Sequence, residues 1–190
     1  MNNYLSKNSE DDYSILTIEA NAFKETKNFI KNHFKVIFPT NLSYIASEAF
    51  RESTINQINF DKVEQLTVIE VNAFSNNNYL NRRYLLNLDG TAYKDLDGNF
   101  IYEGEVYLDN DKKEINTKYF NENLQPNENY KFSEMPYIKM PYGNDKPLFI
   151  LRQGVFEYNP YIRTIDLGNC YGVGYATFNA CYRLLRSEEH

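Results

Sequence analysis

The sequence predicts a solenoid in which short parallel β-strands stack along one axis and are joined by helical or irregular turns. A phrase of one apolar residue, three mostly polar residues, a small residue and Phe occurs as IEANAF, IASEAF and IEVNAF. A related phrase returns later as LRQGVF and VGYATF. A second phrase, with alternating apolar residues, follows the first at a steady offset. Sequence phrases that recur at a fixed period indicate a repeat fold, because the residues of a catalytic loop normally occur only once in a sequence.

The first phrase aligns on its Phe, which is preceded by a small or short residue and, five positions earlier, by an apolar residue. The aligned Phe residues are Phe23, Phe50, Phe74, Phe156 and Phe178. The small residues are Ala22, Ala49, Ala73, Val155 and Thr177, and the apolar residues are Ile18, Ile45, Ile69, Leu151 and Val173. A small neighbour lets two backbones approach, so we expect each Phe to fill the space between consecutive units.

The second phrase predicts one short, half-buried strand in each unit, because apolar and polar residues alternate in it. It occurs as INQINF (55–60) and IRTIDL (162–167), and with a following Pro as KVIFP (35–39) and YIKMP (137–141). Each unit is therefore about 22–27 residues long, within the range of leucine-rich repeats. A strand this short cannot bury its apolar side alone, so the units must stack.

These two phrases, I-x-x-x-A-F and L-x-x-I-x-L-P, resemble the BspA-type leucine-rich repeat of bacterial and some protist surface proteins. The resemblance covers residues 15–74 well and 135–185 fairly well. It implies a curved solenoid whose strands line a concave face. It also implies adhesion or binding of a protein partner, either a host protein or a neighbouring surface protein.

One region, residues 75–134, interrupts the repeat inside an otherwise single leucine-rich-repeat domain spanning residues 1–190. It contains LDGT, DLDGN and LDNDK between residues that favour strands. Asp-Gly between such runs is a strong hairpin signal, which predicts one or two antiparallel β-hairpins within residues 86–119. Residues 120–134 are expected to form an irregular return loop. A hairpin inserted in a solenoid is a frequent place for specificity.

The last unit starts again at FNACYRLL, after which its strand is incomplete. A solenoid end exposes apolar surface unless it is capped. This predicts either a longer array or self-association through the C-terminal repeat. A structural or assembly module that stacks in this way is the alternative to a binding module.

Composition excludes several classes of partner. The net charge is −6 and the sequence pI is about 5.0, which argues against nucleic acid because that partner requires a positive face. No apolar run is long enough to span a bilayer, and the polar start MNNYLSKNSEDD does not resemble a signal peptide. We therefore expect a cell-surface or secreted protein if an export signal has been removed, and a cytoplasmic protein otherwise.

Few residues are suited to catalysis or metal binding. His33 and His190 are the only histidines, and His33 is expected to be structural. Cys170 and Cys181 lack the C-x-x-C spacing of a zinc site. They are expected to be free, buried or half-buried thiols, with a disulfide or a reactive thiol as the alternative. The sequence therefore predicts no enzyme, no cofactor and no metal.

Two short motifs are weak. DLDGN (95–99) resembles the opening of a calcium loop, but position 106 is Val where that loop needs a bidentate Glu. The segment is better explained as a hairpin turn. GNCYGVGYATF contains G-x-G without the third Gly of a dinucleotide site.

The remaining candidate is a surface: the outward positions of the alternating strands on the concave face. These are Lys35, Ile37, Gln57, Asn59, Lys139, Thr164 and Asp166. Their mixed, short and polar character suits an adaptable protein contact, although an ordinary solvated face explains each of them equally well. We expect a non-enzymatic protein-binding or adhesion module that uses this face and the inserted hairpins. An enzyme or calcium-dependent protein that uses the hairpins is the remaining alternative.

Overall fold

The computed structural model describes residues 16–26, 35–104, 119–121, 123 and 125–185. The chain divides into two compact units. The described part of the first unit lies within residues 16–26, 35–81 and 137–185, and that of the second within residues 82–136. The second unit overlaps the expected insertion at 75–134, whose boundaries stay a prediction.

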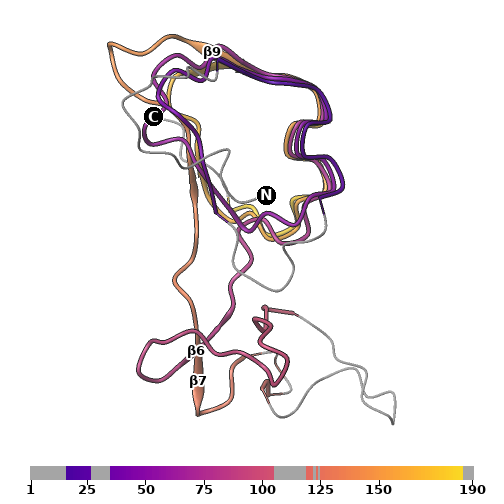
Figure 1. Cartoon of the computed structure of the whole chain (residues 1–190), viewed down its shortest axis with the longest axis vertical. Coiled ribbons are helices and arrows are strands. Elements are labelled where there is room, and N and C mark those ends of the chain that lie inside the picture. Colours follow the sequence, from indigo (N-terminus) through magenta and orange to yellow (C-terminus); the bar gives the residue numbers. More distant parts are fainter. Residues whose placement is uncertain (1–15, 27–34, 105–118, 122, 124, 186–190) are drawn as a thin grey trace. The chain divides into compact units, whose positions relative to one another are not determined.

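The first unit is a solenoid with a five-stranded parallel sheet in the order β1-β3-β5-β9-β11. Its coils superpose when the unit is viewed along its axis (Figure 1). The strands are β1 (Thr17–Ile18), β3 (Tyr44–Ile45), β5 (Val68–Ile69), β9 (Phe149–Leu151) and β11 (Cys170–Val173). The apolar residue of the first phrase sits in the same register throughout, since Ile18 pairs with Ile45, Ile45 with Ile69 and Ile69 with Leu151. The solenoid prediction is confirmed.

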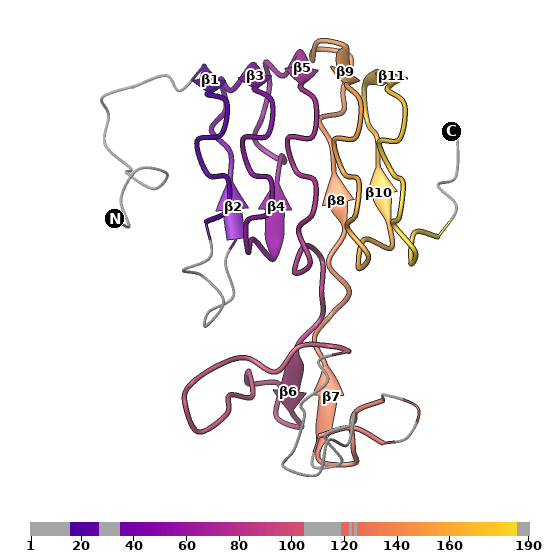
Figure 2. The same ribbon diagram turned by 90° about the vertical axis from the view of Figure 1, so that its right-hand side faces the viewer.

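A second set of strands comes from the alternating phrase: β2 (Lys35–Ile37), β4 (Gln57–Asn59), β8 (Ile138–Lys139) and β10 (Ile165–Asp166). β2 pairs with β4 and β10 pairs with β8, both in parallel, and the four strands follow one another along the solenoid in Figure 2. The expectation of one strand per unit is therefore wrong. The segment before each Phe is also a strand, but at two residues in most coils it is too short to show alternation.

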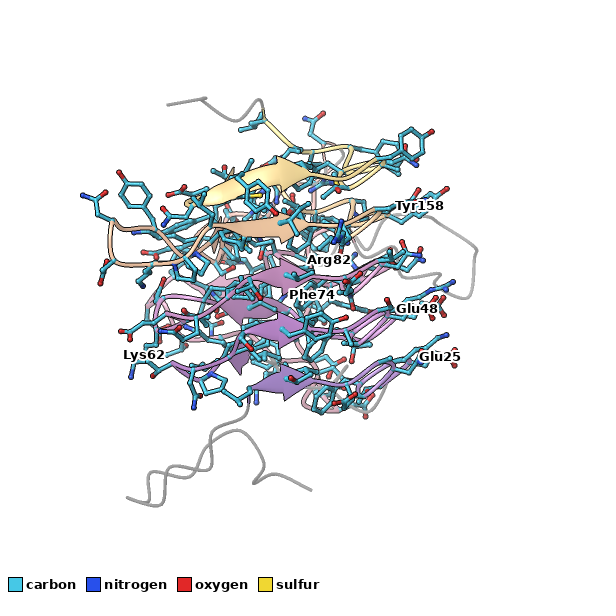
Figure 3. All side chains as sticks on the ribbon, turned by 90° about the horizontal axis from the view of Figure 1, so that it is seen from above. Glu25, Glu48, Lys62, Phe74, Arg82 and Tyr158 are labelled. Atoms are coloured by element: carbon cyan, nitrogen blue, oxygen red, sulfur yellow. The ribbon has the colours of Figure 1, made fainter. Side chains whose placement is uncertain are left out.

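Each Phe of the first phrase lies in a six-residue turn, which we call a phenylalanine turn. The five turns are residues 20–25, 47–52, 71–76, 153–158 and 175–180. No helix occurs among the described residues, so these connections are irregular rather than helical. Glu25, Glu48 and Tyr158, from the first, second and fourth of these turns, lie along one edge of the stack in Figure 3.

The turns share an unusual backbone: the residues two before and two after the Phe both have left-handed φ angles of 54–65°. Those before are Asn21, Glu48, Asn72, Gly154 and Ala176, and those after are Glu25, Glu52, Asn76, Tyr158 and Ala180. Such angles cost about 1–2 kcal/mol for a residue with a side chain. Their recurrence in every turn requires a compensating interaction.

Backbone hydrogen bonds between coils supply that compensation. The N–H of Phe50 donates to the carbonyl of Ala73 at 2.8 Å, Glu48 to Val71 at 3.0 Å and Glu52 to Ser75 at 3.0 Å. The same three bonds occur at each junction between consecutive phenylalanine turns. In the first four turns, the N–H groups of the Phe and of its two left-handed neighbours therefore point toward the following coil.

The Phe rings form a continuous stack inside the solenoid. Ring centroids are 5.0 Å apart for Phe23–Phe50, 5.1 Å for Phe50–Phe74, 5.6 Å for Phe74–Phe156 and 5.9 Å for Phe156–Phe178. The three inner rings are buried, whereas Phe23 and Phe178 are half-buried. Each inner ring thus contacts the coils on both sides, as the sequence predicts.

A polar ladder closes each turn three residues after its Phe, at Thr26, Ser53, Asn77, Asn159 and Cys181. Asn159 Nδ2 donates to the carbonyls of Phe74 (2.9 Å) and Phe156 (2.8 Å), which links two coils. Asn77 Nδ2 makes the equivalent bonds to Phe50 and Phe74. Cys181 Sγ donates to the Phe156 carbonyl at 3.1 Å, so the thiol continues the ladder.

The second unit is built around an antiparallel pair, β6 (Leu85–Asn87) and β7 (Tyr130–Phe132). Its core contains Leu85, Ile101, Tyr119 and Phe120, with rings of Tyr93, Tyr130 and Phe132 packed against it. The predicted antiparallel insertion is confirmed, but residues 130–132 form a strand where an irregular loop was expected. Three residues give too short an alternation for that strand to be recognised from sequence.

Two tight turns in the second unit are closed by aspartates. Leu86 bridges Ala92 across Asp89-Gly90, and Lys94 bridges Phe100 across the DLDGN segment. Asp95 Oδ1 accepts the N–H groups of Asp97 (3.0 Å) and Asn99 (2.8 Å). The DLDGN segment is thus a hairpin turn. The LDNDK motif and residues 105–118 lie outside the described residues.

Candidate functional site

The predicted concave-face residues lie on β2, β4, β8 and β10 or directly beside them. Lys35 pairs with Gln57, Ile37 with Asn59, and Asp166 with Lys139. None of the seven is buried: Lys35, Ile37, Lys139, Thr164 and Asp166 are exposed, and Gln57 and Asn59 are half-buried. We call the outward side of these four strands the strand face. Its role in binding stays a prediction.

Two of the seven residues have a local structural task. Asn59 Oδ1 accepts the N–H of Asp61 at 2.7 Å, and Asp166 Oδ1 accepts that of Gly168 at 3.0 Å. Both bonds are Asx turns that end a strand. The side chains of Lys35, Gln57 and Lys139, in contrast, make no hydrogen bond to a described residue, which leaves their polar groups available to a partner.

Tyr137 belongs to the strand face but was missed from the sequence. It precedes Ile138 as Thr164 precedes Ile165, and these two isoleucines are paired. Its side chain is 55% exposed. Counting both residues that flank Ile138, instead of only the one after it, would have identified Tyr137.

Beside Tyr137, the strand face opens into a hollow of about 290 Å³. Its apolar floor is formed by Phe60, Met140 and Pro141, which are buried. Tyr137 and Tyr142, the latter 71% exposed, are the tyrosines of its lining. Exposed tyrosines beside an apolar floor resemble the anchor sites of protein interfaces.

The polar lining of the hollow comes from Asp61, Lys139 and Lys146. Lys146 Nζ donates to the Val63 carbonyl at 3.2 Å, which ties the 143–146 turn to the preceding coil. An ammonium group has three donors, so Lys146 keeps donors for a ligand. Two lysines against one aspartate make this hollow locally positive on an acidic protein. It can hold an apolar or aromatic side chain with a carboxylate nearby.

The two thiols are not suited to nucleophilic chemistry. Cys181 is buried, and burial raises the pKa of its thiol to about 11. Burial also raises the pKa of Cys170, which is half-buried. Both cysteines are free. Because the thiolate is the reactive form, raised pKa values make both thiols poor nucleophiles at neutral pH. His33 and His190 lie outside the described residues.

A metal ion in a protein is held by several acidic, histidine or cysteine side chains that lie close together. No three such side chains gather in a way that could hold an ion within the part of the chain that the structure describes. Desolvation acts to raise the pKa of Asp95, but hydrogen bonds from Asn99, Asp97 and Gly98 outweigh it and lower that pKa. The Asp95 carboxylate is therefore used by its own turn.

No helix that could cross a membrane is found in the described residues.

The comparison with known families agrees with the geometry. Residues 3–90 match the family model described as BspA type Leucine rich repeat region (6 copies). No curated protein and no solved structure matches the chain. The matched segment contains the first three phenylalanine turns, and residues 138–185 repeat the same turn geometry beyond it. Residues 3–90 are therefore a BspA-type leucine-rich-repeat region.

Proposed function

We propose that this chain is a non-enzymatic protein-binding module of a bacterial surface or secreted protein, which binds its partner through the strand face and the adjoining hollow. The family is typical of bacterial surface proteins, and leucine-rich-repeat solenoids typically serve as scaffolds for binding. Fold alone does not define function, so the proposal depends on the site.

One observation carries the proposal: the hollow places two exposed tyrosines beside an apolar floor and two lysines. Tyrosine supplies a large contact area at low entropic cost, and lysine supplies charge complementarity to an acidic partner. The strands beneath are held by parallel pairing, so the surface is presented by a rigid element. The partner chemistry that fits is a peptide segment with an aromatic or apolar side chain next to Asp or Glu.

A phage-displayed library of random peptides tests the proposal. We expect selection on the full chain to enrich peptides with that pattern. Tyr137→Ala combined with Lys139→Glu should weaken binding of an enriched synthetic peptide at least about tenfold, as measured by calorimetry. The matched control, Tyr175→Ala with Arg152→Glu, removes one exposed tyrosine and one cation elsewhere and should leave the affinity unchanged.

A second variant tests the wider strand face. Gln57→Arg with Thr164→Arg adds bulk and charge at two positions that are not buried. Thermal stability should therefore be unchanged, while binding of a partner protein through the strand face should be lost. Peptides that bind the Tyr137/Lys139 variant as tightly as the unmodified chain, or a library that yields no enriched peptide, would contradict the proposal.

A further inference from the structure

The coil that contains Phe178 presents a row of backbone donors that no described residue accepts. In each preceding phenylalanine turn, three N–H groups donate to the next coil. The equivalent groups in the turn 175–180 belong to Ala176, Phe178 and Ala180. These two alanines have the same left-handed φ angles (56° and 58°) as their counterparts, so their N–H groups have the same orientation.

The first phenylalanine turn presents the complementary row. At every junction, the acceptors are the carbonyls at three positions before, one before and one after the Phe of the next coil. In the turn 20–25 these are the carbonyls of Ala20, Ala22 and Lys24, and no described residue donates to them. Three donors at one end of the described solenoid therefore match three acceptors at the other.

The strands and rings at the two ends match as well. β11 and β1 are the two edges of the five-stranded sheet, and both run parallel to their neighbours. Among the described residues, Phe23 and Phe178 each stack on one ring of this series, whereas the inner rings have two neighbours. Large apolar side chains are also exposed on the coil at 170–185: Tyr171, Val173, Tyr175, Tyr182 and Leu185.

The side-chain charges at the two ends of the described solenoid do not repel each other. Inside the solenoid, Lys24 pairs with Glu48 of the next coil. Lys24 is the residue after the Phe of its turn, and Glu48 lies two residues before the Phe of the following turn. At a junction between the two ends these positions are Asn179 and Asn21, both exposed and neutral.

We propose that two copies of this chain associate head to tail, with the turn 175–180 of one copy seated on the turn 20–25 of the next. The N–H groups of Ala176, Phe178 and Ala180 donate to the carbonyls of Ala20, Ala22 and Lys24 of the second copy, and Phe178 stacks on its Phe23. This contact is independent of the strand face. Because it joins two different surfaces, it does not close at a dimer and adds copies in a row.

Sedimentation velocity of the full chain over a roughly hundredfold range of concentration tests this proposal. The average mass should rise continuously beyond that of a dimer. A monomeric mass over the whole range, or a plateau at the dimer, overturns it.

Charge variants test the register of the contact. In Asn21→Lys with Asn179→Lys, the two lysines meet across the junction, although Asn179 lies beside Glu157 of its own chain (Nδ2 to Oε1, 2.7 Å). Association should weaken about two- to fivefold. Asn21→Glu with Asn179→Lys should strengthen it by a similar factor, and Asn179→Lys alone is the control. Glu is compatible with position 21 because Glu48 has the same φ angle as Asn21. Mass that rises equally in both double variants places the contact elsewhere and overturns the proposal.

Discussion

The solenoid unit and the inserted unit solve the problem of burying apolar surface in opposite ways. In the solenoid, Phe rings lie at the same position in successive coils, nearly parallel, with interplanar angles of 4° for Phe50–Phe74 and 12° for Phe74–Phe156. In the inserted unit, Tyr93, Tyr119 and Tyr130 meet at 56–67° without a sequence period. A core whose residues recur at a fixed period can be predicted from sequence, whereas a core without such a period cannot.

The two units also treat buried polar groups differently. The solenoid hydrogen-bonds its turn carbonyls through a ladder that repeats with the coils, as Asn77 and Asn159 show. The inserted unit has a bidentate ion pair, in which Arg83 Nε and Nη2 lie 3.1 and 3.0 Å from the Glu103 carboxylate. The Arg83 guanidinium also covers the Phe132 ring at 4.1 Å. The ladder spreads its contribution to stability over many coils, whereas in the inserted unit one ion pair makes this contribution at a single place.

The largest expected effect comes from the ring stack. Phe50→Ala should lower the free energy of unfolding by about 3–5 kcal/mol, because rings and backbone of two neighbouring coils line the cavity. Chemical denaturation measures this value. Phe23→Ala is the control and should cost less, since Phe23 is half-buried and, among the described residues, stacks on Phe50 alone. Equal losses of unfolding free energy in the two variants would mean that Phe50 gains no stability from contacting the coils on both sides.

The ion pair of the inserted unit ranks second. Arg83→Met should destabilise that unit by about 2–3 kcal/mol, because it removes the guanidinium that faces the Glu103 carboxylate, and the Glu103 side chain is only 8% exposed. Hydrogen exchange of the amides in residues 82–104 measures the change. Replacing Arg83 and Glu103 together by Met should restore most of the loss. A double variant no better than the single one would contradict this account of the pair.

The polar ladder is expected to contribute less for each residue. Asn77→Ala leaves turn carbonyls of Phe50 and Phe74 without its amide and should cost about 1–3 kcal/mol in a thermal or denaturant titration. The adjacent Asn78 is exposed and provides a matched control, for which we expect no measurable change on replacement by Ala. If both substitutions cost the same, the ladder does not stabilise the solenoid.

The smallest effect is electrostatic and depends on pH. The hydrogen bond from Lys24 lowers the pKa of Glu48, and bonds from Arg51 add to it. Since the folded-state pKa is the lower one, the stabilisation is present above the ordinary value of 4.5 and is lost as pH falls through the folded-state pKa. Denaturation at a series of pH values should show a shallower acid-side loss for Glu48→Gln. The contribution at neutral pH is about 0.2–1 kcal/mol.

The sequence was sufficient to predict the features that recur. The apolar residue and the Phe of each phrase occupy equivalent places in all five coils, so the parallel stacking followed from their spacing. The two-residue strands, such as β3 and β5, were missed because alternation needs more residues than they contain. The left-handed angles were also missed, since Glu48 and Tyr158 carry no signal for a conformation that glycine normally adopts.

The candidate site was only partly predictable. Gln57 and Lys139 could be placed on the strand face because their neighbours alternate. Tyr142 could not, since it lies after Pro141, outside the alternating phrase, and reaches the hollow only through the path of the 140–146 segment. A hollow formed by residues from different coils has no sequence period, so its shape requires the structure.

Amide hydrogen exchange measured by NMR on the dilute chain tests the central claim, that each phenylalanine turn donates its N–H groups to the next coil. The amides of Phe23, Phe50, Phe74 and Phe156 each donate to a following coil and should be protected. The amide of Phe178 should exchange rapidly. Rapid exchange at Phe50 and Phe74, or protection at Phe178 equal to theirs, would contradict the stacked-coil account.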